Sequence, residues 1–549
     1  MKHKIYINPR GNFSMKSKKL LKLLLAAFMS VSLSSTILQT GIKDVSAAQE
    51  NTVSVSLEGS ERLILEDESK ASYIVKVSNM KDANAFDITI SYDSDSLVYR
   101  GYDLCIDGIQ VYRTNEENGK VRLVMGSTNN ISVNELSDLI KFNFWLKTST
   151  NNENAYVKLE RMDVAGNGVS YNVERGNNEA VSTISSYYNN SDLTNDKNVT
   201  IEDLSAALKY YCANESNADW ETSKKADINF DGTVDSADYI MLSQFIKDSK
   251  FDLTLLHTND LHGRVGGVTN SSDGRQDGTG MPEYSTIIKK ISANKKNTLA
   301  LDAGDIFLRG PYEKYQGKME MDMLNKVGMD AWVLGNNEFR SPNIDGSNDN
   351  TVGTAGSLEM VDKQVDSLIH QANFPTLCAN VKVNSTGDYI VGTQPYMIKI
   401  IDGVRVGIIG VTSTKPADRN WESASNKTFE SAEITVANLL PEVREKSDVV
   451  IVLSHAGIDV DRKITGVDAI VSADTHLFME EPESPNGFPI YQVGGEQNNH
   501  LGEFSLSFTL NDEDRFNLSS FNGKSYTGEG YEADSAINEI IESYTSSNN

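Results

Sequence analysis

The chain has 549 residues and a formal net charge of −26 at neutral pH. This length exceeds what one hydrophobic core organises, so we expect about three or four domains. The acidic balance disfavours nucleic acid and anionic membrane surfaces as partners, because both attract clusters of Lys and Arg. It is compatible with calcium-binding loops and an extracellular location.

Residues 1–48 have the pattern of a secretory signal peptide. Lys and Arg are scattered up to Lys22, an apolar run covers 23–33, and small residues close the segment at 45–48. This order predicts export with cleavage near Ala48. No later segment is long and apolar enough to span a bilayer. The cysteines are odd in number and scattered, so they predict no disulfide framework: Cys105, Cys212 and Cys378.

The first module, residues 51–184, is dominated by alternation of apolar and polar residues. Its apolar positions recur every second residue in four runs: Tyr73, Val75 and Val77; Phe86, Ile88 and Ile90; Val121, Leu123 and Met125; Phe142, Phe144 and Leu146. Such runs, separated by short polar turns, predict an antiparallel β-sandwich. The run ASYIVKVSNMKDANAFDITISYDSDSLVYRG and the later LIKFNFWLK resemble a cohesin domain. The resemblance implies a module that receives a dockerin or a related partner; an ordinary structural sandwich is the alternative.

The second module, residues 187–250, contains a calcium-loop pattern and a following apolar helix. Side-chain oxygens stand at loop positions one, three, five, nine and twelve, a carbonyl is offered at seven, and Gly232 occupies the sharp turn at six. Calcium prefers six to eight oxygen ligands at this spacing. The predicted ligands are Asp227, Asn229, Asp231, Thr233, Asp235 and Asp238.

A second copy of this loop begins 35 residues earlier, at Asp192 against Asp227. Its predicted ligands are Asp192, Thr194, Asp196, Asn198 and Asp203. Lys197 replaces the glycine at position six, so we expect weaker calcium binding here. Two such loop–helix repeats resemble a type I dockerin, which implies a small helical module that folds with calcium and docks to a cohesin.

The third module, residues 252–535, alternates strands with helices. Strands are expected over 253–256, 298–301, 331–334, 404–411, 449–453, 469–471 and 503–510, and helices over 318–327, 358–372 and 432–446. Polar clusters follow five of the strands: TNDLHG, DAGD, GNNEF, SHAG and SADTH. Because open α/β sheets carry their sites at the carboxyl ends of strands, these clusters predict one shared site.

The ordered set DLHG, GD, GNNEF, SHAG and DTH resembles the calcineurin-like metallophosphoesterases, most closely the catalytic domain of the 5′-nucleotidase family. The resemblance implies a four-layer α/β domain and a small phosphate ester as substrate. It implies two divalent metals, Mn, Zn or similar, held by Asp260, His262 and His476 for the first, Asp305 as a bridge, and Asn336, His455 and Asp474 for the second. Two such cations stabilise the attacking and leaving oxygens of a phosphoryl displacement.

This sequence departs from the family pattern at the catalytic pair. The family's GNHEFD reads GNNEFR here, so Asn337 and Arg340 stand at the positions of a catalytic His and of the Asp that orients it. An amide cannot deliver a proton to a leaving alkoxide, and loss of general acid help lowers rates by about two to four orders of magnitude. Either this pair now holds an oxyanion and the enzyme acts on good leaving groups, or the domain is a non-catalytic scaffold that has kept only its metal-binding fold. Arg309 could also face an anion, although a solvated surface Arg is the commoner fate.

After the last expected strand, an acidic, Gly-rich stretch leads to a helix-like segment in a C-terminal tail, residues 536–549. In the resembled family a helix here leads into a nucleoside-binding domain, which we do not expect in this sequence, so a nucleotide substrate is an analogy only. His257, on the strand before the DLHG loop, is expected in the core or just behind the site. The sequence as a whole predicts a secreted phosphoesterase that cohesin- or dockerin-bearing proteins anchor outside the cell or at its surface.

Overall fold

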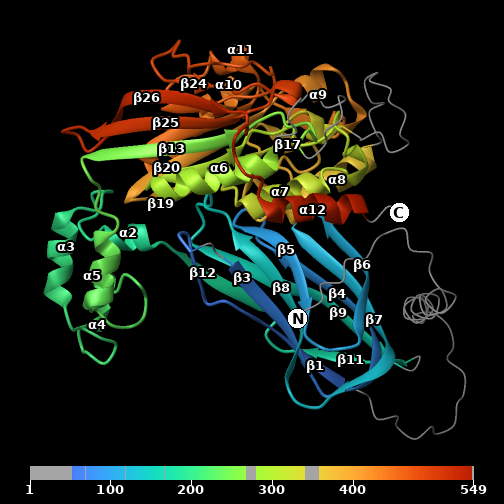
Figure 1. Cartoon of the computed structure of the whole chain (residues 1–549). Coiled ribbons are helices and arrows are strands. Elements are labelled where there is room, and N and C mark those ends of the chain that lie inside the picture. Colours follow the sequence, from blue (N-terminus) through green and yellow to red (C-terminus); the bar gives the residue numbers. More distant parts are fainter. Residues whose placement is uncertain are drawn as a thin grey trace, which may run out of the picture. The chain divides into compact units, whose positions relative to one another are not determined.

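The computed structural model describes residues 52–67, 70–117, 119–166, 169–266, 280–340 and 358–546. The expected signal peptide lies outside these residues. The chain divides into two compact units, the first made of most residues up to Ile184 and the second of Ser185 onward with the short segments 64–69 and 146–151. Figure 1 shows the helices and strands of the whole chain.

The first unit consists of two β-sheets. One sheet has the order β11 (Asn172–Arg175), β1 (Thr52–Gly59), β3 (Lys70–Ser78), β8 (Ser137–Leu146) and β5 (Leu97–Leu104). The other has the order β2 (Arg62–Ile64), β12 (Glu179–Ser185), β9 (Asn154–Gly166), β4 (Met80–Tyr92), β7 (Lys120–Val133) and β6 (Ile109–Glu117), with β10 (Val169–Ser170) paired to β9. The apolar positions predicted from the alternation are buried, and Tyr92 of one sheet packs on Phe144 of the other at 5.1 Å between ring centroids. The β-rich prediction is therefore confirmed, although β1 and β11 pair in parallel.

Residues 187–250 form a small helical module around the two predicted loops. Its helices are α2 (Tyr187–Ser191), α3 (Ile201–Ala207), η1 (Leu208–Tyr210), α4 (Trp220–Ser223), η2 (Lys224–Ala226) and α5 (Ser236–Ser243). The first loop runs into α3 and the second into α5, and each of these helices begins with a capping box closed by the Asp at loop position twelve. Buried Tyr188, Ile228, Leu242 and Phe245 form the module's core. The repeat inferred from the sequence is thus a structural repeat.

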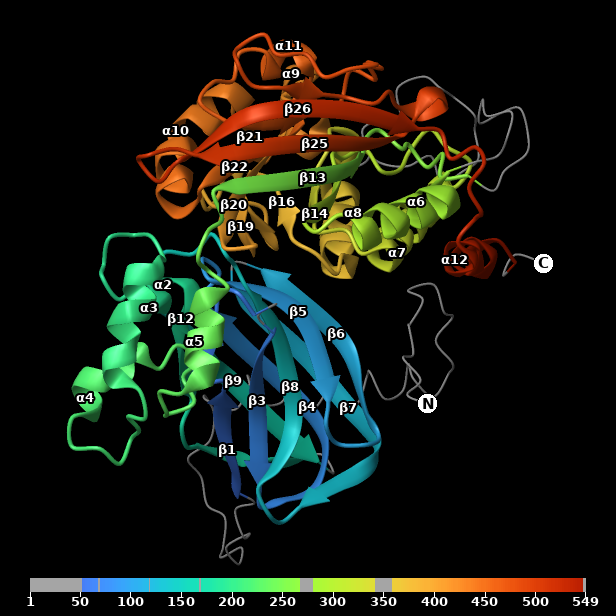
Figure 2. The ribbon, with the colours of Figure 1, turned by 60° about the vertical axis from the view of Figure 1, so that its left-hand side comes forward.

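The third module contains two mostly parallel sheets (Figure 2). The first has the order β18 (Thr393–Gln394), β16 (Thr376–Leu377), β15 (Ala331–Val333), β14 (Thr298–Asp302), β13 (Lys250–Thr258), β25 (Leu501–Leu510) and β26 (Phe516–Tyr526). The second has the order β19 (Tyr396–Ile401), β20 (Val404–Thr412), β22 (Val449–His455), β23 (Ala469–Val471) and β24 (Ile490–Tyr491). Strands β25, β26 and β19 run antiparallel to their neighbours, and the others run parallel. Two short strands, β17 (Val381–Val383) and β21 (Lys427–Phe429), pair separately.

Helices flank these two sheets. Helices α6 (Met281–Asn294), α7 (Lys318–Val327), α8 (Leu358–Gln371) and α12 (Ser535–Thr545) share one core with the first sheet. Apolar side chains of both sheets, among them Leu255 and Ile451, form a second core, and α10 (Ala432–Lys446) packs on β20. The remaining helical turns are η3 (Glu313–Tyr315), η4 (Asn337–Phe339), α9 (Lys415–Asp418), η5 (Glu422–Ala424), α11 (Ile458–Asp461) and η6 (Glu496–Asn498). The predicted α/β class is confirmed.

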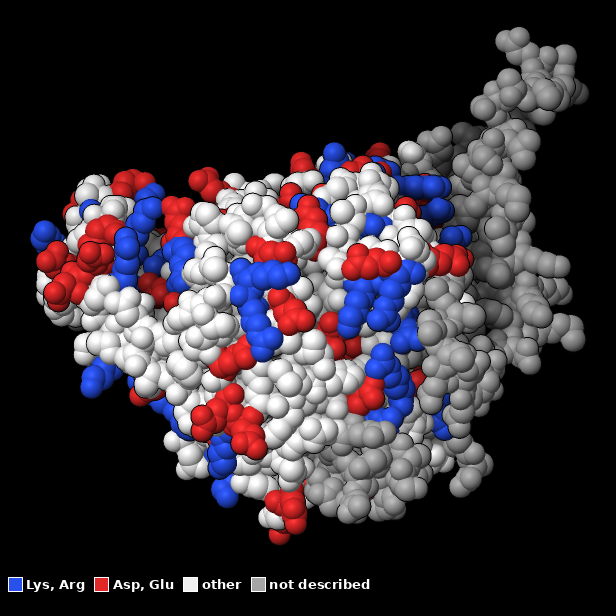
Figure 3. All heavy atoms as spheres, turned by 90° about the horizontal axis from the view of Figure 1, so that it is seen from above, with Lys and Arg blue, Asp and Glu red and all other residues white. Residues whose placement is uncertain are grey.

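The elements expected from the sequence agree closely with those observed. The helices over 318–327 and 432–446 are α7 and α10, and the expected strands are present with ends shifted by a few residues. One prediction was wrong: the stretch after β25 contains strand β26, whose side chains are largely exposed and so show no apolar alternation. None of the described helices is long and apolar enough to cross a membrane. On the face that Figure 3 shows, Lys and Arg lie interspersed with Asp and Glu.

Candidate metal centre

The side chains proposed as metal ligands lie at the carboxyl ends of five strands. Parallel strands present these ends at the same edge of each sheet, and the loops of the two sheets meet there, since Asp260 of the first sheet lies within 4 Å of His455 and His476 of the second. β13 is followed by Asp260 and His262, β14 by Asp305, β15 by Asn336, β22 ends in His455, and β23 is followed by Asp474 and His476. Most are buried, and Asp474 and His476 are partly exposed.

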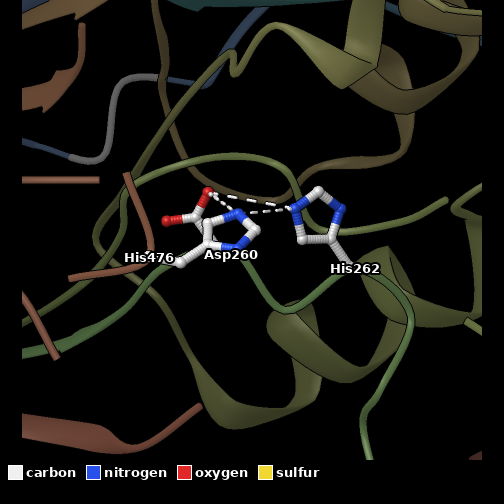
Figure 4. A group of neighbouring side chains, drawn as sticks. All are labelled: Asp260, His262 and His476. Atoms are coloured by element: carbon white, nitrogen blue, oxygen red, sulfur yellow. Dashed lines mark hydrogen bonds and ion pairs between the residues drawn. The ribbon is translucent and has the colours of Figure 1, made fainter. Parts of the chain in front are cut away.

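Asp260, His262 and His476 form one group of converging donor atoms (Figure 4). Nε2 of His262 lies 3.2 Å from Nε2 of His476. Oδ1 of Asp260 lies 3.3 Å from Nε2 of His476 and 3.9 Å from Nε2 of His262. Donor atoms bound to one tetrahedral cation at about 2.0–2.1 Å are about 3.3–3.4 Å apart. The spacing of these donors therefore fits a metal ion.

Asp260, Asp305 and His455 form a second group. Nε2 of His455 lies 3.2 Å from Oδ2 of Asp305, 3.8 Å from Oδ1 of Asp260 and 3.8 Å from Oδ1 of Asp474. Oδ2 of Asp305 is also 3.6 Å from Nε2 of His262. The sequence predicted Asp305 as the bridge, whereas in the structure Asp260 also faces both groups.

The imidazole of His455 is oriented for ligation. Its Nδ1 lies 2.6 Å from the carbonyl oxygen of Ala303. Because a carbonyl only accepts, Nδ1 donates this hydrogen bond and Nε2 is left facing the carboxylates. Nε2 is buried and makes no hydrogen bond of good geometry with any described residue. A buried nitrogen in this state, beside two carboxylates, fits a divalent cation.

The ionisation of the cluster also suits a cation. Burial alone would raise the pKa of Asp305, but the imidazoles of His455 and His262 hold that pKa well below its usual range. Burial lowers the pKa of His262 to about 4, so its imidazole is neutral at pH 7, the form that binds metals. Burial acts in the same direction on His455, but Asp305, Asp260 and Asp474 outweigh it and raise the pKa of that imidazole well above its usual value. Asp305 is therefore ionised, and His455 would have to release its proton to bind a cation.

Backbone strain is concentrated at the proposed ligands. Asp260, His262, Asp305, Asp474 and His476 have φ values of 49°, 49°, 57°, 74° and 53°. Only a few per cent of residues other than glycine adopt positive φ, at a cost of about 1–3 kcal/mol each. Such strain clusters at functional sites, where it holds side chains in positions that a relaxed loop would not give.

These donors mix nitrogen and carboxylate oxygen, which suits divalent cations such as Mn²⁺ or Zn²⁺. Cations held there would supply Lewis-acid stabilisation of the charge that develops on phosphoryl oxygens. The protein's own contribution is to fix the donors in a buried, strained arrangement with the ionisation described above.

The altered catalytic pair lies directly beside this centre. The backbone N–H of Asn337 donates to Oδ1 of Asp305 at 2.7 Å, and its side-chain amide donates to Oδ2 of the same carboxylate. Nη1 of Arg340 donates to Oδ1 of Asn337 at 2.9 Å. In the orientation that satisfies both of its polar atoms, the amide of Asn336 donates to Oδ1 of Asp474 at 2.7 Å. The three residues therefore form one polar network with the metal-facing carboxylates.

Some charged residues of the centre escaped the sequence analysis. Oε1 of Glu496 lies 3.9 Å from Nε2 of His262 and is paired with Arg309. Glu496 can approach because the preceding Gly495 has no side chain: a Cβ there would lie 2.7 Å from Cβ of Asp260. The Nζ of Lys415 on α9 pairs with Asp474. Lys415 follows β20 by three residues and Glu496 follows β24 by five, but neither lies in a recognisable motif, so residue spacing alone gave no signal.

Glu338 and His257 lie close to this centre without facing the proposed cations. The carboxylate of Glu338 accepts from the backbone N–H groups of Asp305, Ile306 and Gly335 at 3.0, 2.9 and 2.7 Å. It thereby ties the loop after β14 to the loop after β15. His257 is fully buried, stacks edge-on to Tyr491, and has its pKa lowered to about 3 by burial. It is a neutral core residue, which is one of the two positions expected from the sequence.

The two calcium loops have matching backbones. Positions four and six have positive φ in both copies: 58° and 74° at Asn195 and Lys197, 60° and 86° at Phe230 and Gly232. In the second loop, Oδ2 of Asp227 accepts from Gly232 N–H at 3.0 Å, so the carboxylate at position one points into the loop. The predicted ligands thus share one register, and calcium binding itself stays a prediction.

Known proteins match the second and third modules. The family model of the calcineurin-like phosphoesterases matches residues 253–478, and that of the type I dockerin domain matches residues 190–247. The trifunctional nucleotide phosphoesterase YfkN of Bacillus subtilis is 27% identical over 321 residues, covering 54% of this chain and 21% of that protein. Snake venom 5′-nucleotidase of Gloydius brevicauda is 32% identical over 252 residues, covering 43% of this chain and 39% of the venom enzyme. The chain thus spans two-fifths or less of the length of these relatives.

Among solved structures, that of YfkN has 22% identity and a TM-score of 0.45, and covers 54% of this chain and 98% of that chain. A cohesin module of a Clostridium perfringens glycoside hydrolase has 19% identity and a TM-score of 0.22, and covers 24% of this chain and 97% of the module. Likeness at this level does not establish a cohesin. The family matches support a metal-dependent hydrolase: the chain carries a type I dockerin domain followed by a calcineurin-like phosphoesterase domain with 5′-nucleotidase homologues.

Proposed function

We propose that this protein is a secreted phosphoesterase that uses two divalent metals and is held in an extracellular assembly through its dockerin domain. The observation that carries the proposal is the convergence of Asp260, His262, Asp305, His455 and His476 from four strands, with donor separations of 3.2–3.9 Å. Two cations held by such a set of donors would suit displacement at phosphorus.

The residues around the centre have separate roles in this proposal. The carboxylates and imidazoles hold the cations, and the polar network through Asn337 holds Asp305 in place. Glu338 keeps the two loops that carry these groups together. Asp474 would stand in for a histidine ligand, since carboxylate oxygen binds Mn²⁺ at least as readily as imidazole does.

The substrate class is a small phosphate ester. The relatives are named as nucleotide phosphoesterases and 5′-nucleotidases, which supports, by analogy, an organic phosphate monoester. The dockerin match supports a cohesin-bearing partner, and the first module is proposed to be cohesin-like. The pattern of residues 1–48 supports export.

A second function is favoured by one observation, namely that an amide occupies position 337. In that alternative the domain binds metal but lacks turnover, and the chain is a scaffold. Purified full-length protein loaded with Mn²⁺ or Zn²⁺ decides between the two, with bound metal counted and p-nitrophenyl phosphate and bis(p-nitrophenyl) phosphate as substrates. Hydrolysis would support the enzymatic function, whereas two bound metals without turnover of any ester would support the scaffold function.

A further inference from the structure

Arg340 carries a guanidinium that forms no ion pair with any described carboxylate. Its Nη1 donates to Oδ1 of Asn337 at 2.9 Å, and its Cζ lies 5.4 Å from the ring centroid of Trp421. No Asp or Glu among the described residues forms an ion pair with it, whereas Arg309 is paired with Glu496 and Lys415 with Asp474. A guanidinium has five N–H donors, and among the described residues the one side chain that accepts from that of Arg340 is Asn337.

Arg340 is coupled to the metal-facing carboxylates by two consecutive hydrogen-bonded contacts. The guanidinium binds the oxygen of the Asn337 amide, and the nitrogen of that amide binds Oδ2 of Asp305. The same Oδ2 lies 3.2 Å from Nε2 of His455. The charge is therefore one side chain away from the centre, partly buried, and fixed against an aromatic face.

The groups next to Asp305 on this side cannot protonate a leaving group. The amide of Asn337 has no proton to give at neutral pH, and arginine stays protonated in proteins. What Arg340 can offer instead is hydrogen bonding and charge, directed at an oxyanion as it forms.

We propose that Arg340 is a catalytic residue that binds the departing oxygen of the substrate as its negative charge develops, in place of proton donation. The inference rests on the phosphoesterase function proposed above. In the step, the oxygen of a water molecule forms a bond to phosphorus while the bond from phosphorus to the leaving oxygen breaks. The electron pair of that bond stays on the leaving oxygen, which departs as an anion bound by Arg340, and the proton of the water passes to solvent.

This step selects substrates by the basicity of the leaving group. An alkoxide is too basic to depart without a proton, whereas an aryloxide or a phosphate departs as a stable anion. The geometry therefore points to aryl phosphates and phosphoanhydrides as substrates, and to poor turnover of alkyl esters. Loss of general acid help costs about two to four orders of magnitude, which sets the expected preference of an aryl over an alkyl ester.

The test uses full-length protein loaded with Mn²⁺ and compares kcat/KM for p-nitrophenyl phosphate, ADP and glycerol 2-phosphate. The variants are Arg340→Gln, which removes the charge, Arg340→Lys, which keeps it without the planar fork, and Arg419→Gln as the matched control. Arg419 lies 5.9 Å from the same Trp421 ring centroid, so the control makes the same change of charge nearby without touching Asn337. Bound metal is counted in every variant to exclude loss of the centre.

We expect Arg340→Gln to lower kcat on the aryl ester and ADP by about 10²–10³, as removal of one oxyanion donor does elsewhere. Arg340→Lys should recover part of this loss, and Arg419→Gln should match the wild type. A readout independent of turnover is calorimetric binding of methylenediphosphonate, whose second phosphonate mimics the leaving phosphate. Arg340→Gln should weaken it at least tenfold while leaving the affinity for inorganic phosphate unchanged.

The possible failures are distinguishable. No turnover of any ester by the metal-loaded wild type would overturn the proposed function. Turnover of glycerol 2-phosphate equal to that of p-nitrophenyl phosphate would overturn the role of Arg340 while leaving the phosphoesterase standing. If Arg340→Gln kept the wild-type turnover and the wild-type affinity for methylenediphosphonate, the role of Arg340 would also be overturned, because Arg340 would then only pack on Trp421.

Discussion

Asp260→Asn tests whether one carboxylate serves both groups of the metal centre. Oδ1 of Asp260 lies 3.3 Å from Nε2 of His476 and 3.8 Å from Nε2 of His455, so its charge acts on both groups. At an effective dielectric constant of about 20, two unit charges about 3.3 Å apart interact by about 5 kcal/mol. Removing such a charge should lower the affinity of each site for its metal by a factor of about 10²–10⁴.

This loss of metal affinity can be followed through the thermal stability of the protein. A metal present at about 1,000 times its dissociation constant stabilises the folded state by about 4 kcal/mol, so two sites give about 8 kcal/mol. For domains of about 150–250 residues, each kcal/mol moves Tm by about 2–4 °C. The wild-type phosphoesterase transition should therefore rise by about 16–32 °C with Mn²⁺. That of Asp260→Asn should rise by at most about 6–11 °C, because a hundredfold weaker site stabilises the folded state by only about 1.4 kcal/mol. Without metal the variant should be less stable at neutral pH, because burial raises the pKa of Asp260 but His476 and His455 outweigh it and hold that pKa below its usual value, so the charged carboxylate stabilises the folded state.

The assay is differential scanning calorimetry of the full chain with and without Mn²⁺. Asp402→Asn is the matched control, since it makes the same change at a residue with φ of 54° that pairs with Lys296 elsewhere on the domain. The control should keep the wild-type shift. An unchanged Mn²⁺ shift in Asp260→Asn would refute the shared-ligand reasoning.

Three further outcomes are expected. Removing calcium with EGTA should unfold the dockerin module, read as lost hydrogen-exchange protection of α3 and α5; unchanged protection would contradict calcium-dependent folding. Lys197→Gly should tighten calcium binding to the first loop by about fivefold, since glycine relieves about 1 kcal/mol of backbone strain at φ 74°. Calorimetry that shows no gain in calcium affinity would contradict this strain. Lys415→Gln should raise the affinity for the second metal by about tenfold, because the ammonium of Lys415 competes with that metal for Oδ1 of Asp474. An equal or weaker affinity in a metal titration would show that Lys415 instead holds Asp474 in place.

The sequence was most informative where a short-range pattern decides the structure. Apolar runs predicted β13, β14 and β22, and the polar clusters after them predicted which loops meet at the sheet edge. Oxygen spacing predicted both calcium loops, whose backbones have the same signs of φ at positions four and six. In each case the physical rule acts within about a dozen residues.

Features set by tertiary approach were beyond the sequence. Spacing identifies the loops of Asp260 and Asp305, but not which of their oxygens face both groups. Glu496 and Lys415 reach the centre from η6 and α9, elements that carry no motif. Strand β26 is an exposed edge strand, so burial imposes no alternation on its side chains.

The most direct test of the account is a count of bound transition metal together with turnover on one sample. Full-length protein is purified with Mn²⁺, its metal content is measured by mass spectrometry, and hydrolysis of p-nitrophenyl phosphate is followed at neutral pH. The account predicts two Mn²⁺ per chain and hydrolysis that a chelator abolishes. Fewer than two metals would contradict the centre built from Asp260, His262, Asp305, His455 and His476, and two metals without hydrolysis would contradict its use as a phosphoesterase.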